Sequence, residues 1–147
     1  MKKKTKTKIL VAGTFDIIHS GHIKFLYAAK SLANDSELIV VVARDRNVKR
    51  IKGHEPIFGE TERLEIVSAL KPVDKAILGL DSDNIFEILK VIKPDIVALG
   101  YDQKISESEL ITWAERQGLK LKIVRLPKFS AGISSSSEVR RKLMEKD

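Results

Sequence analysis

The sequence predicts an α/β fold in which a parallel sheet carries helices on both faces. Short apolar runs suited to buried strands alternate along the chain with segments whose apolar residues recur at helical spacing. Prolines at Pro72 and Pro94 stand directly after two of the helical segments, where a helix is expected to end. Because alternating strands and helices with short links require right-handed crossovers, the strands should lie parallel in one sheet.

The first elements form a strand, a helix and a second strand. Ile9–Ala12 is a short apolar run that predicts a buried strand, and a helix beginning near His22 and ending near Ala33 follows it. Glu37–Ala43 contains an unbroken apolar stretch, which is typical of a strand buried on both faces. A basic loop over Arg44–Gly59 is expected next.

The rest of the chain repeats this alternation. A capping box opens one of the helices, since Ser106 precedes Glu109 by three residues. The expected elements are, in order, a helix over Thr61–Leu70, a strand over Lys75–Leu78, a helix over Asn84–Ile92, a strand over Ile96–Leu99, the helix opened by Ser106, a strand over Lys120–Val124 and a final helix from Ser135 to about Glu145.

Length and composition indicate one globular domain. The chain has 147 residues, of which 43% are hydrophobic, so we expect a single domain over residues 1–147 with a basic, frayed end over residues 1–7. The absence of cysteine excludes disulfides, thiolate nucleophiles and cysteine zinc sites, and any metal must use oxygen or histidine ligands. No apolar run approaches the ~20 residues that cross a bilayer. We therefore expect a soluble protein of the cytoplasm with no membrane partner.

The positive charge favours a phosphorylated small molecule as ligand. The formal net charge is +7, but five lysines fall within the first eight residues and leave the remaining chain only mildly basic. The other basic residues of interest follow a predicted strand and have no interleaved aromatic residues, which favours a phosphate site over a nucleic-acid groove. These residues are Arg44, Arg46, Lys49, Arg50 and Lys52.

The most informative segment is the turn from Gly13 to His22, between the first strand and the first helix. All three histidines of the chain lie in its first 54 residues, and His19 and His22 flank a Ser-Gly turn within this segment. Each feature alone is usually a surface histidine or an ordinary turn. Together they predict an anion site at this turn. The start of the helix directs its free amides and the positive end of its dipole at the turn, and both histidines can face the same anion.

A second segment, Ile133–Arg140, carries four consecutive serines. Ser135 and Glu138 have the spacing of an ordinary capping box, and the same hydroxyl-rich helix start could hold the β- and γ-phosphates of a nucleotide. The two interpretations are compatible. The register stays open, because anchoring the motif on Val139 and Arg140 selects Ser135–Ser137, whereas anchoring on Ile133 shifts it by one residue.

These two segments resemble the signatures of the cytidylyltransferase-like nucleotidyltransferases. Gly-Thr-Phe-Asp-x-x-His-x-Gly-His stands at residues 13–22, and the serine run followed by Val139-Arg140 stands near the other end, so the resemblance covers nearly the whole chain. It implies a single-domain Rossmann-like sheet of five parallel strands in the order 3-2-1-4-5. The site should then lie at the carboxyl ends of strands 1 and 4, where the order reverses.

The resemblance also implies roles for single residues. His19 and His22 would donate hydrogen bonds to phosphate oxygens in the transition state, Arg63 would reach the triphosphate, and either Lys52 or Lys49 would clamp phosphates. Asp16 would orient the turn by accepting backbone amides or would help a metal indirectly. We assign no protein ligand to the expected divalent cation, Mg²⁺, which the phosphates would mainly hold. The implied nucleotide-binding set is Gly13, Thr14, Phe15, Asp16, His19, Gly21, His22, Gly100, Asp102, Gln103, Ser135, Ser136, Ser137 and Arg140.

Three further stretches resemble archaeal FAD synthase more than the cytidylyltransferases. They are Ala43–Asp45, Leu70–Gly79 and Ala98–Gln103, whose last part stands where the cytidylyltransferases have a Gly-Asp-Asp-Trp type of sequence. The resemblance therefore implies ATP and FMN as substrates and, because the resembled enzymes are often dimers, a homodimer. Candidate acceptor-binding residues are Arg44, Asp45 and Tyr101, whereas Asp102 and Gln103 could also be plain turn residues.

Three alternatives stay open. Glycerol-3-phosphate cytidylyltransferase and phosphopantetheine adenylyltransferase would use the same residues on another acceptor. A nucleotide-binding or nucleic-acid-binding module without chemistry could use the lysine-rich end as its electrostatic contact. The presence of both His19 and His22 argues against this last alternative, because binding alone would not require both.

Overall fold

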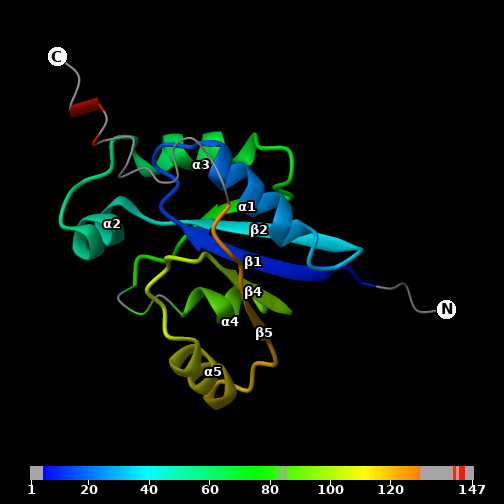
Figure 1. Cartoon of the computed structure of the whole chain (residues 1–147). Helices are drawn as coiled ribbons and strands as arrows, with labels where there is room; N and C mark the ends of the chain where they lie inside the picture. Colours follow the sequence, from blue (N-terminus) through cyan, green and yellow to red (C-terminus); the bar gives the residue numbers. More distant parts are fainter. Residues whose placement is uncertain (1–4, 83, 85, 130–140, 142, 145–147) are drawn as a thin grey trace.

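A parallel five-stranded sheet in the order β3-β2-β1-β4-β5 forms the centre of the structure (Figure 1). The structure is a computed structural model and describes residues 5–82, 84, 86–129, 141 and 143–144. This sheet confirms the fold class and the strand order expected from the sequence. The strands are β1 (Thr7–Gly13), β2 (Ser36–Val42), β3 (Lys75–Leu78), β4 (Ile96–Leu99) and β5 (Lys122–Arg125).

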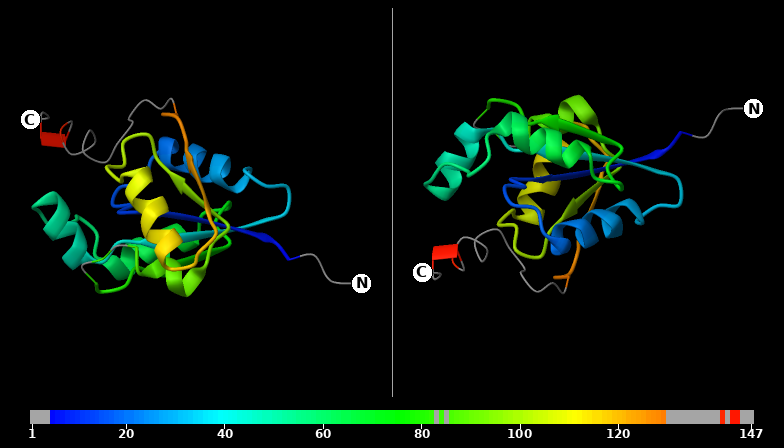
Figure 2. Two further views of the ribbon diagram at one scale, coloured as in Figure 1. Left: turned by 90° about the horizontal axis from the view of Figure 1, so that it is seen from below. Right: turned by 90° about the horizontal axis from the view of Figure 1, so that it is seen from above.

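Helices cover both faces of the sheet. The helices are α1 (Ser20–Lys30), α2 (Asp45–Lys52), α3 (Glu60–Ser68), α4 (Ile88–Ile92) and α5 (Glu107–Arg116). Side chains of α1 and α3 belong to one buried cluster, and those of α4 and α5 belong to the other. In Figure 1, α1 and α3 lie above the sheet and α4 and α5 lie below it, and the views from below and from above in Figure 2 each look onto one of these layers.

The alternation of side chains along β1 explains why its sequence is apolar throughout. Ile9 and Val11 pack in the cluster that α1 and α3 cover, whereas Leu10 packs in the cluster of α4 and α5. Successive side chains of a strand point to opposite faces, so a strand between two helical layers needs apolar residues at every position.

Two aspartates each bind an amide near the beginning of an inner strand, one in β2 and one in β1. Asp74 precedes β3 and accepts a hydrogen bond from the amide of Leu38 at 2.7 Å, and Asp95 precedes β4 and accepts one from the amide of Lys8 at 2.8 Å. The Lys30 ammonium also donates to Asp74, at 2.6 Å. Each carboxylate thus satisfies an amide of the neighbouring strand and helps to set the register of the pair.

Several predicted boundaries differ from the structure. The first helix begins at Ser20 instead of near His22, because His19 caps its start, and it ends at Lys30 instead of near Ala33. The helix expected over Asn84–Ile92 is regular only as α4, and the last strand is shifted to Lys122–Arg125. The predicted final helix lies mostly outside the described residues, although residues 141, 143 and 144 are helical.

The prediction of a continuous basic loop over Arg44–Gly59 was wrong, because α2 occupies its first half. Asp45 stands in the first turn of this helix and basic residues stand in its last turn, which suits the helix dipole. Gly53 ends the helix in the left-handed conformation, with a φ of 79°. Val48 is buried, and the side chain of Asn47 donates to the carbonyl of Leu80 at 3.3 Å.

None of the helices in the described part of the chain has both the length and the apolar character that crossing a membrane requires.

The Asp74 contacts make stability depend on pH. Burial alone would raise the pKa of Asp74, but hydrogen bonds from Lys30 and the Leu38 amide, with the charges of Lys30 and Lys6, lower it below its usual value of 3.8. A lowered carboxyl pKa stabilises the fold above the unfolded value, and this stabilisation is lost as the pH falls through the folded pKa.

We therefore expect Asp74→Asn to lower the free energy of unfolding by about 1 kcal/mol at pH 7, and by progressively less as the pH falls below 3.8. Urea unfolding at several pH values measures the difference. Asp35→Asn is the matched control, since it removes the same charge from an exposed residue nearby. An equal loss in both variants at all pH values would contradict the role of Asp74.

Candidate active site

The candidate site lies at the carboxyl ends of the strands, where the sheet order changes direction between β1 and β4. Because all the strands are parallel, the segment after each strand leaves this edge. The candidate residues lie in or after the segments that follow β1, β2 and β4, and the first of these segments is the turn that begins at Gly13. A crevice outside this reversal is where open parallel sheets bind their ligands.

Phe15 shapes the turn after β1. Its backbone is left-handed, with a φ of 51°, and its side chain is only 6% exposed. A Cβ atom on Gly13 would stand 2.9 Å from Cε2 of Phe15, so this ring requires glycine at position 13. The Phe15 ring also lies 5.8 Å from the ring of His22, measured between centroids. The buried side chain of Phe15 therefore supports His22, and the nucleotide contact expected of Phe15 stays a prediction.

The two histidines of the turn cap the helix that they precede. The backbone amide of His19 donates to Nδ1 of His22 at 3.1 Å, and the amide of Gly21 donates to Nδ1 of His19 at 3.1 Å. The two rings lie 4.0 Å apart between centroids. An Nδ1 that accepts a hydrogen bond carries no proton, so each neutral imidazole holds its proton on Nε2.

These contacts revise the predicted use of the first amides of α1. We expected them to face an anion, but the amide of Gly21 binds the His19 ring and the amide of His22 donates to the carbonyl of His19 at 3.0 Å. The helix start instead fixes the positions and tautomers of two imidazoles. The positive end of the helix dipole still lies beneath them.

His22 is held in its neutral form. Burial, followed by the nearby charges of His19 and Lys52, lowers the pKa of His22 from 6.5 to about 4. At neutral pH its ring is therefore a hydrogen-bond donor through Nε2 and carries no charge.

The same environment separates two lysines that the sequence left as alternatives. The charge of Lys52 is close enough to lower the pKa of His22. Lys49 instead has its ammonium 3.8 Å from Glu55, and both side chains are well exposed. Lys52 is thus the lysine whose charge acts on His22.

Asp16 joins the turn to the loop between α2 and α3. Its side chain is 2% exposed, and its two oxygens accept hydrogen bonds from the amides of Ile57 at 2.8 Å and Phe58 at 2.9 Å. This confirms that Asp16 accepts backbone amides, although they come from a loop 41 and 42 residues away rather than from its own turn.

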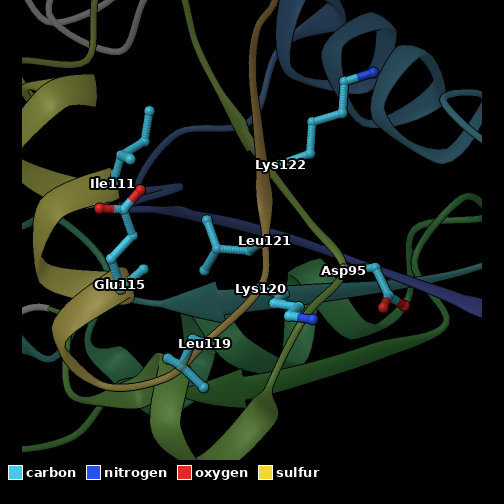
Figure 3. Close-up of a pocket in the computed structure, with 8 residues that line it drawn as sticks. Asp95, Ile111, Glu115, Leu119, Lys120, Leu121 and Lys122 are labelled. Atoms are coloured by element: carbon cyan, nitrogen blue, oxygen red, sulfur yellow. The ribbon is translucent and has the colours of Figure 1, made fainter.

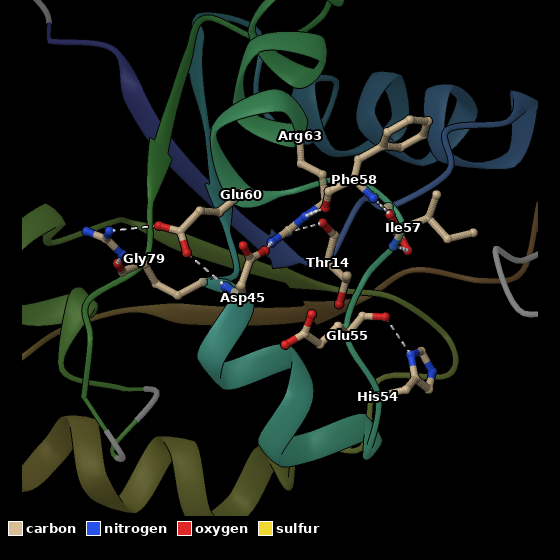
Figure 4. A network of polar contacts seen from close by, with 11 residues as sticks. Thr14, Asp45, His54, Glu55, Ile57, Phe58, Glu60, Arg63 and Gly79 are labelled. Carbon is tan, nitrogen blue, oxygen red and sulfur yellow. Dashed lines mark hydrogen bonds and ion pairs between the residues drawn. The ribbon is translucent and has the colours of Figure 1, made fainter.

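Arg63 is bound within the protein, and the contact with the triphosphate that the sequence analysis expected stays a prediction. Its side chain is 0% exposed, and its guanidinium donates to the carbonyl of Phe58 at 2.9 Å, to the carbonyl of Thr14 at 2.8 Å and to Asp45 at 2.6 Å. Figure 4 shows these segments converging on the guanidinium. Burial of a permanent charge requires such partners, so Arg63 holds the walls of the site together.

The two candidate acceptor residues after β2 also form hydrogen bonds with other residues of the protein. Arg44 donates to the carbonyl of Gly79 at 2.8 Å and to the carboxylate of Glu60 at 3.0 Å. The amide of Asp45 donates to the same carboxylate at 3.0 Å, while its side chain binds Arg63. Both side chains are partly exposed, at 37% for Arg44 and 43% for Asp45. Their visible role is to anchor the start of α2.

The loop after β4 presents two of its candidate residues to solvent and uses two internally. Tyr101 and Asp102 are exposed, and the ammonium of Lys128 lies 5.8 Å from the centre of the Tyr101 ring. The amide of Gly100 donates to the side chain of Gln103 at 2.7 Å, and that side chain donates to the carbonyl of Ala12 at 2.9 Å. Gln103 thus joins this loop to the end of β1.

Two parts of the expected site need separate mention. Ser135, Ser136, Ser137 and Arg140 lie outside the described residues. Among the residues that the structure describes, no three histidine or acidic side chains gather as a metal-binding group.

A cavity elsewhere on the molecule does not belong to this site. It has a volume of about 410 Å³ and lies between α5 and the beginning of β5 (Figure 3). Asp95 and Lys122, which line it, stand at the amino ends of strands. They are therefore at the opposite edge of the sheet from the turn over residues 13–22, called the histidine turn below. The lining of the cavity mixes both charges and provides no set of phosphate-binding groups.

The chain matches the cytidylyltransferase-like family over residues 10–142. The FAD synthase of Korarchaeum cryptofilum is 52% identical over 94% of this chain and 92% of that protein. The FAD synthase of Thermoplasma volcanium is 47% identical over 94% of each chain.

Two crystal structures share the fold. A lipopolysaccharide core biosynthesis protein from Thermoplasma volcanium GSS1 has a TM-score of 0.79 and 44% identity, covering 86% of this chain and all of that one. A protein from Archaeoglobus fulgidus has a TM-score of 0.67 at 18% identity, covering 88% of this chain and 94% of that one.

The environment of His22 predicts an unusual titration. Because the folded pKa of about 4 lies below the ordinary 6.5, the unfolded chain takes up the proton first, and His22 lowers stability as the pH falls from 6.5 to about 4. We expect an NMR titration to place the His22 midpoint near 4 in the wild type, and at a higher pH in Lys52→Gln, which lacks the nearby charge. Lys49→Gln should leave the midpoint unchanged. Equal midpoints in all three proteins would contradict the proximity of Lys52.

Proposed function

Because this chain belongs to the cytidylyltransferase-like family, we propose on that premise that it is an FAD synthase, which transfers the adenylyl group of ATP to FMN and releases pyrophosphate. The observation that carries this assignment is the similarity to FAD synthases along nearly the whole chain. The geometry of the histidine turn supports it, because two imidazoles with fixed tautomers stand where a nucleotide would bind.

The reaction needs positioning and charge neutralisation rather than a covalent intermediate. An oxygen of the FMN phosphate attacks the α-phosphorus of ATP in line, forming the new P–O bond as the bond between the α-phosphorus and the bridging oxygen breaks. Pyrophosphate carries the electron pair away. The attacking phosphate is largely dianionic at neutral pH, since its second pKa is about 6, and it therefore needs no general base.

His19 and His22 are proposed to stabilise the transferring group. Each would donate its Nε2 hydrogen to oxygens of the α- and β-phosphates, whose charge grows in the transition state. Their positions depend on the hydrogen bonds at Nδ1, which leave little freedom of rotation. Because the pKa of His22 is lowered to about 4, it acts as a neutral donor and not as an acid or base at pH 7.

Lys52 is proposed to supply the positive charge that the neutral His22 lacks. It is exposed at the end of α2, and its charge is felt at His22, so it is placed to clamp the phosphates. The α1 dipole adds a second favourable field. The proposed phosphate site thus combines an exposed cation with two imidazoles that hydrogen bonds at Nδ1 hold in place.

The divalent cation, which we propose to be Mg²⁺, would supply charge neutralisation at the phosphates when bound. Both oxygens of Asp16 already accept backbone amides, and the described residues contain no three-ligand group. Oxygen ligands from the triphosphate itself fit this arrangement, since Mg²⁺ is commonly held by one or two carboxylates together with substrate phosphates.

The other predicted residues divide into supporting and contacting roles. Arg63, Asp16 and Phe15 position the turn, because their side chains are buried and their partners belong to the protein. Tyr101 and Asp102 are exposed and are proposed to contact FMN and the nucleotide, respectively. A homodimer, a cytoplasmic location and the phosphate contacts of Ser135–Ser137 and Arg140 stay predictions.

A substrate panel tests the assignment. We expect pyrophosphate to be released with Mg²⁺, ATP and FMN, and FAD to appear in equal amount. Glycerol-3-phosphate with CTP, and phosphopantetheine with ATP, serve as competing pairs. Release with either of these pairs and not with ATP and FMN would contradict the proposal, and binding to arbitrary DNA without any release would favour the non-catalytic alternative.

Variants of His22 separate its capping role from its chemical role. His22→Ala should lower kcat by a factor on the order of 10²–10³, the usual loss of one transition-state donor. His22→Gln should lose about as much, because glutamine at this third helical position keeps the reciprocal cap but lacks the imidazole Nε2 hydrogen. His54→Ala, an exposed histidine, should keep wild-type kcat. Full activity in His22→Ala would eliminate the donor role.

A further inference from the structure

Arg125, the last residue of β5, binds an entire loop with one side chain. Its Nη1 donates to the carbonyls of Gly100 at 2.8 Å and Gln103 at 3.0 Å, and its Nη2 donates to the carbonyl of Ile105 at 2.9 Å. Its Nε donates to Glu107, at the start of α5, at 2.7 Å. These four contacts span the whole connection from β4 to α5.

Gln103 joins the loop that Arg125 binds to the histidine turn. The side-chain oxygen of Gln103 accepts the amide of Gly100, and its nitrogen donates to the carbonyl of Ala12, directly before Gly13. A continuous chain of hydrogen bonds therefore runs from β5 through this loop to the end of β1. It crosses the sheet where the strand order reverses.

This chain of contacts determines where two exposed side chains stand. Tyr101 and Asp102 lie between Gly100 and Gln103, whose backbone carbonyls are both held by Arg125. Neither side chain is buried, so packing contributes little to their placement. Without these hydrogen bonds, the substrate would have to order the loop when it binds. The loss of conformational entropy would then weaken its binding.

We propose that Arg125 is a positioning residue for nucleotide binding, acting through Gln103 and the loop Gly100–Ile105. The inference rests on the proposed function, in which Asp102 faces the nucleotide. The guanidinium is suited to this role because its planar set of donors can serve several carbonyls at once. A lysine at the same position would keep the charge but could not reproduce that geometry.

The kinetic test compares variants of β5 in the full chain. We expect Arg125→Met to raise the KM for ATP about tenfold while kcat changes less than threefold, since the histidine turn stays intact. Arg125→Lys should recover little of this loss. Glu107→Ala removes only the Nε partner and should raise KM two- to threefold. Lys122→Met, at the other end of the same strand, loses the same charge and should behave as wild type.

Hydrogen exchange gives a readout that does not depend on turnover. Arg125→Met should speed amide exchange at Gly100 and Gln103 at least tenfold, while β1 amides keep their wild-type rates. Unchanged loop exchange, full recovery in Arg125→Lys, or a lower melting temperature with an unchanged KM would each overturn the positioning role. If wild type and Lys122→Met make no FAD, the proposed function fails, and loop exchange still decides whether Arg125 orders this loop.

Discussion

The buried charge of Arg63 is the constraint on which the site depends. Its guanidinium has no exposed surface, so each donor group needs a partner within the protein. The partners are the carbonyl of Thr14 in the turn after β1, the carbonyl of Phe58 before α3 and the carboxylate of Asp45 at the start of α2. Asp16 also connects the turn after β1 to the segment before α3, because its carboxylate accepts a hydrogen bond from the amide of Phe58. Three segments distant in sequence can satisfy these groups together in only one arrangement, and that arrangement forms one wall of the site.

The turn after β1 is therefore fixed from two sides. Arg63 in α3 binds the carbonyl of Thr14, and Gln103 in the loop after β4 binds the carbonyl of Ala12, so the residues on either side of Gly13 are held from opposite halves of the sheet. Gly13 itself must lack a side chain because the Phe15 ring occupies that space. In-line transfer gains most from groups that are already in position when the substrate arrives. The structure provides this through hydrogen bonds to backbone carbonyls, which hold the turn without using the donors proposed to face phosphate.

Sequence reasoning predicted the sheet well because its signals are local. Continuous apolar runs such as Glu37–Ala43 mark strands buried on both faces, and capping residues such as Ser106 mark helix starts. It missed α2, whose only buried apolar residue is Val48, although Asp45, the basic last turn and Gly53 were available signals. It could not predict that Arg63, Arg44 and Gln103 form hydrogen bonds within the protein, because most of their partners lie 16 to 91 residues away along the chain. Whether a polar side chain turns outward or inward is decided by these distant partners.

The histidine turn shows how a folding contact and a chemical property can depend on the same atoms. Nδ1 of His19 and of His22 each accept an amide at the start of α1, and this is what puts the proton of each neutral ring on Nε2. Burial then keeps His22 neutral, with its pKa lowered to about 4. Protonation at Nδ1 would break the cap and place a charge beside His19 and Lys52. The turn is thus most stable in the protonation state that makes His22 a neutral donor, and the charge needed for phosphate must come from elsewhere. We propose that Lys52, at the end of the helix that sequence reasoning missed, provides it.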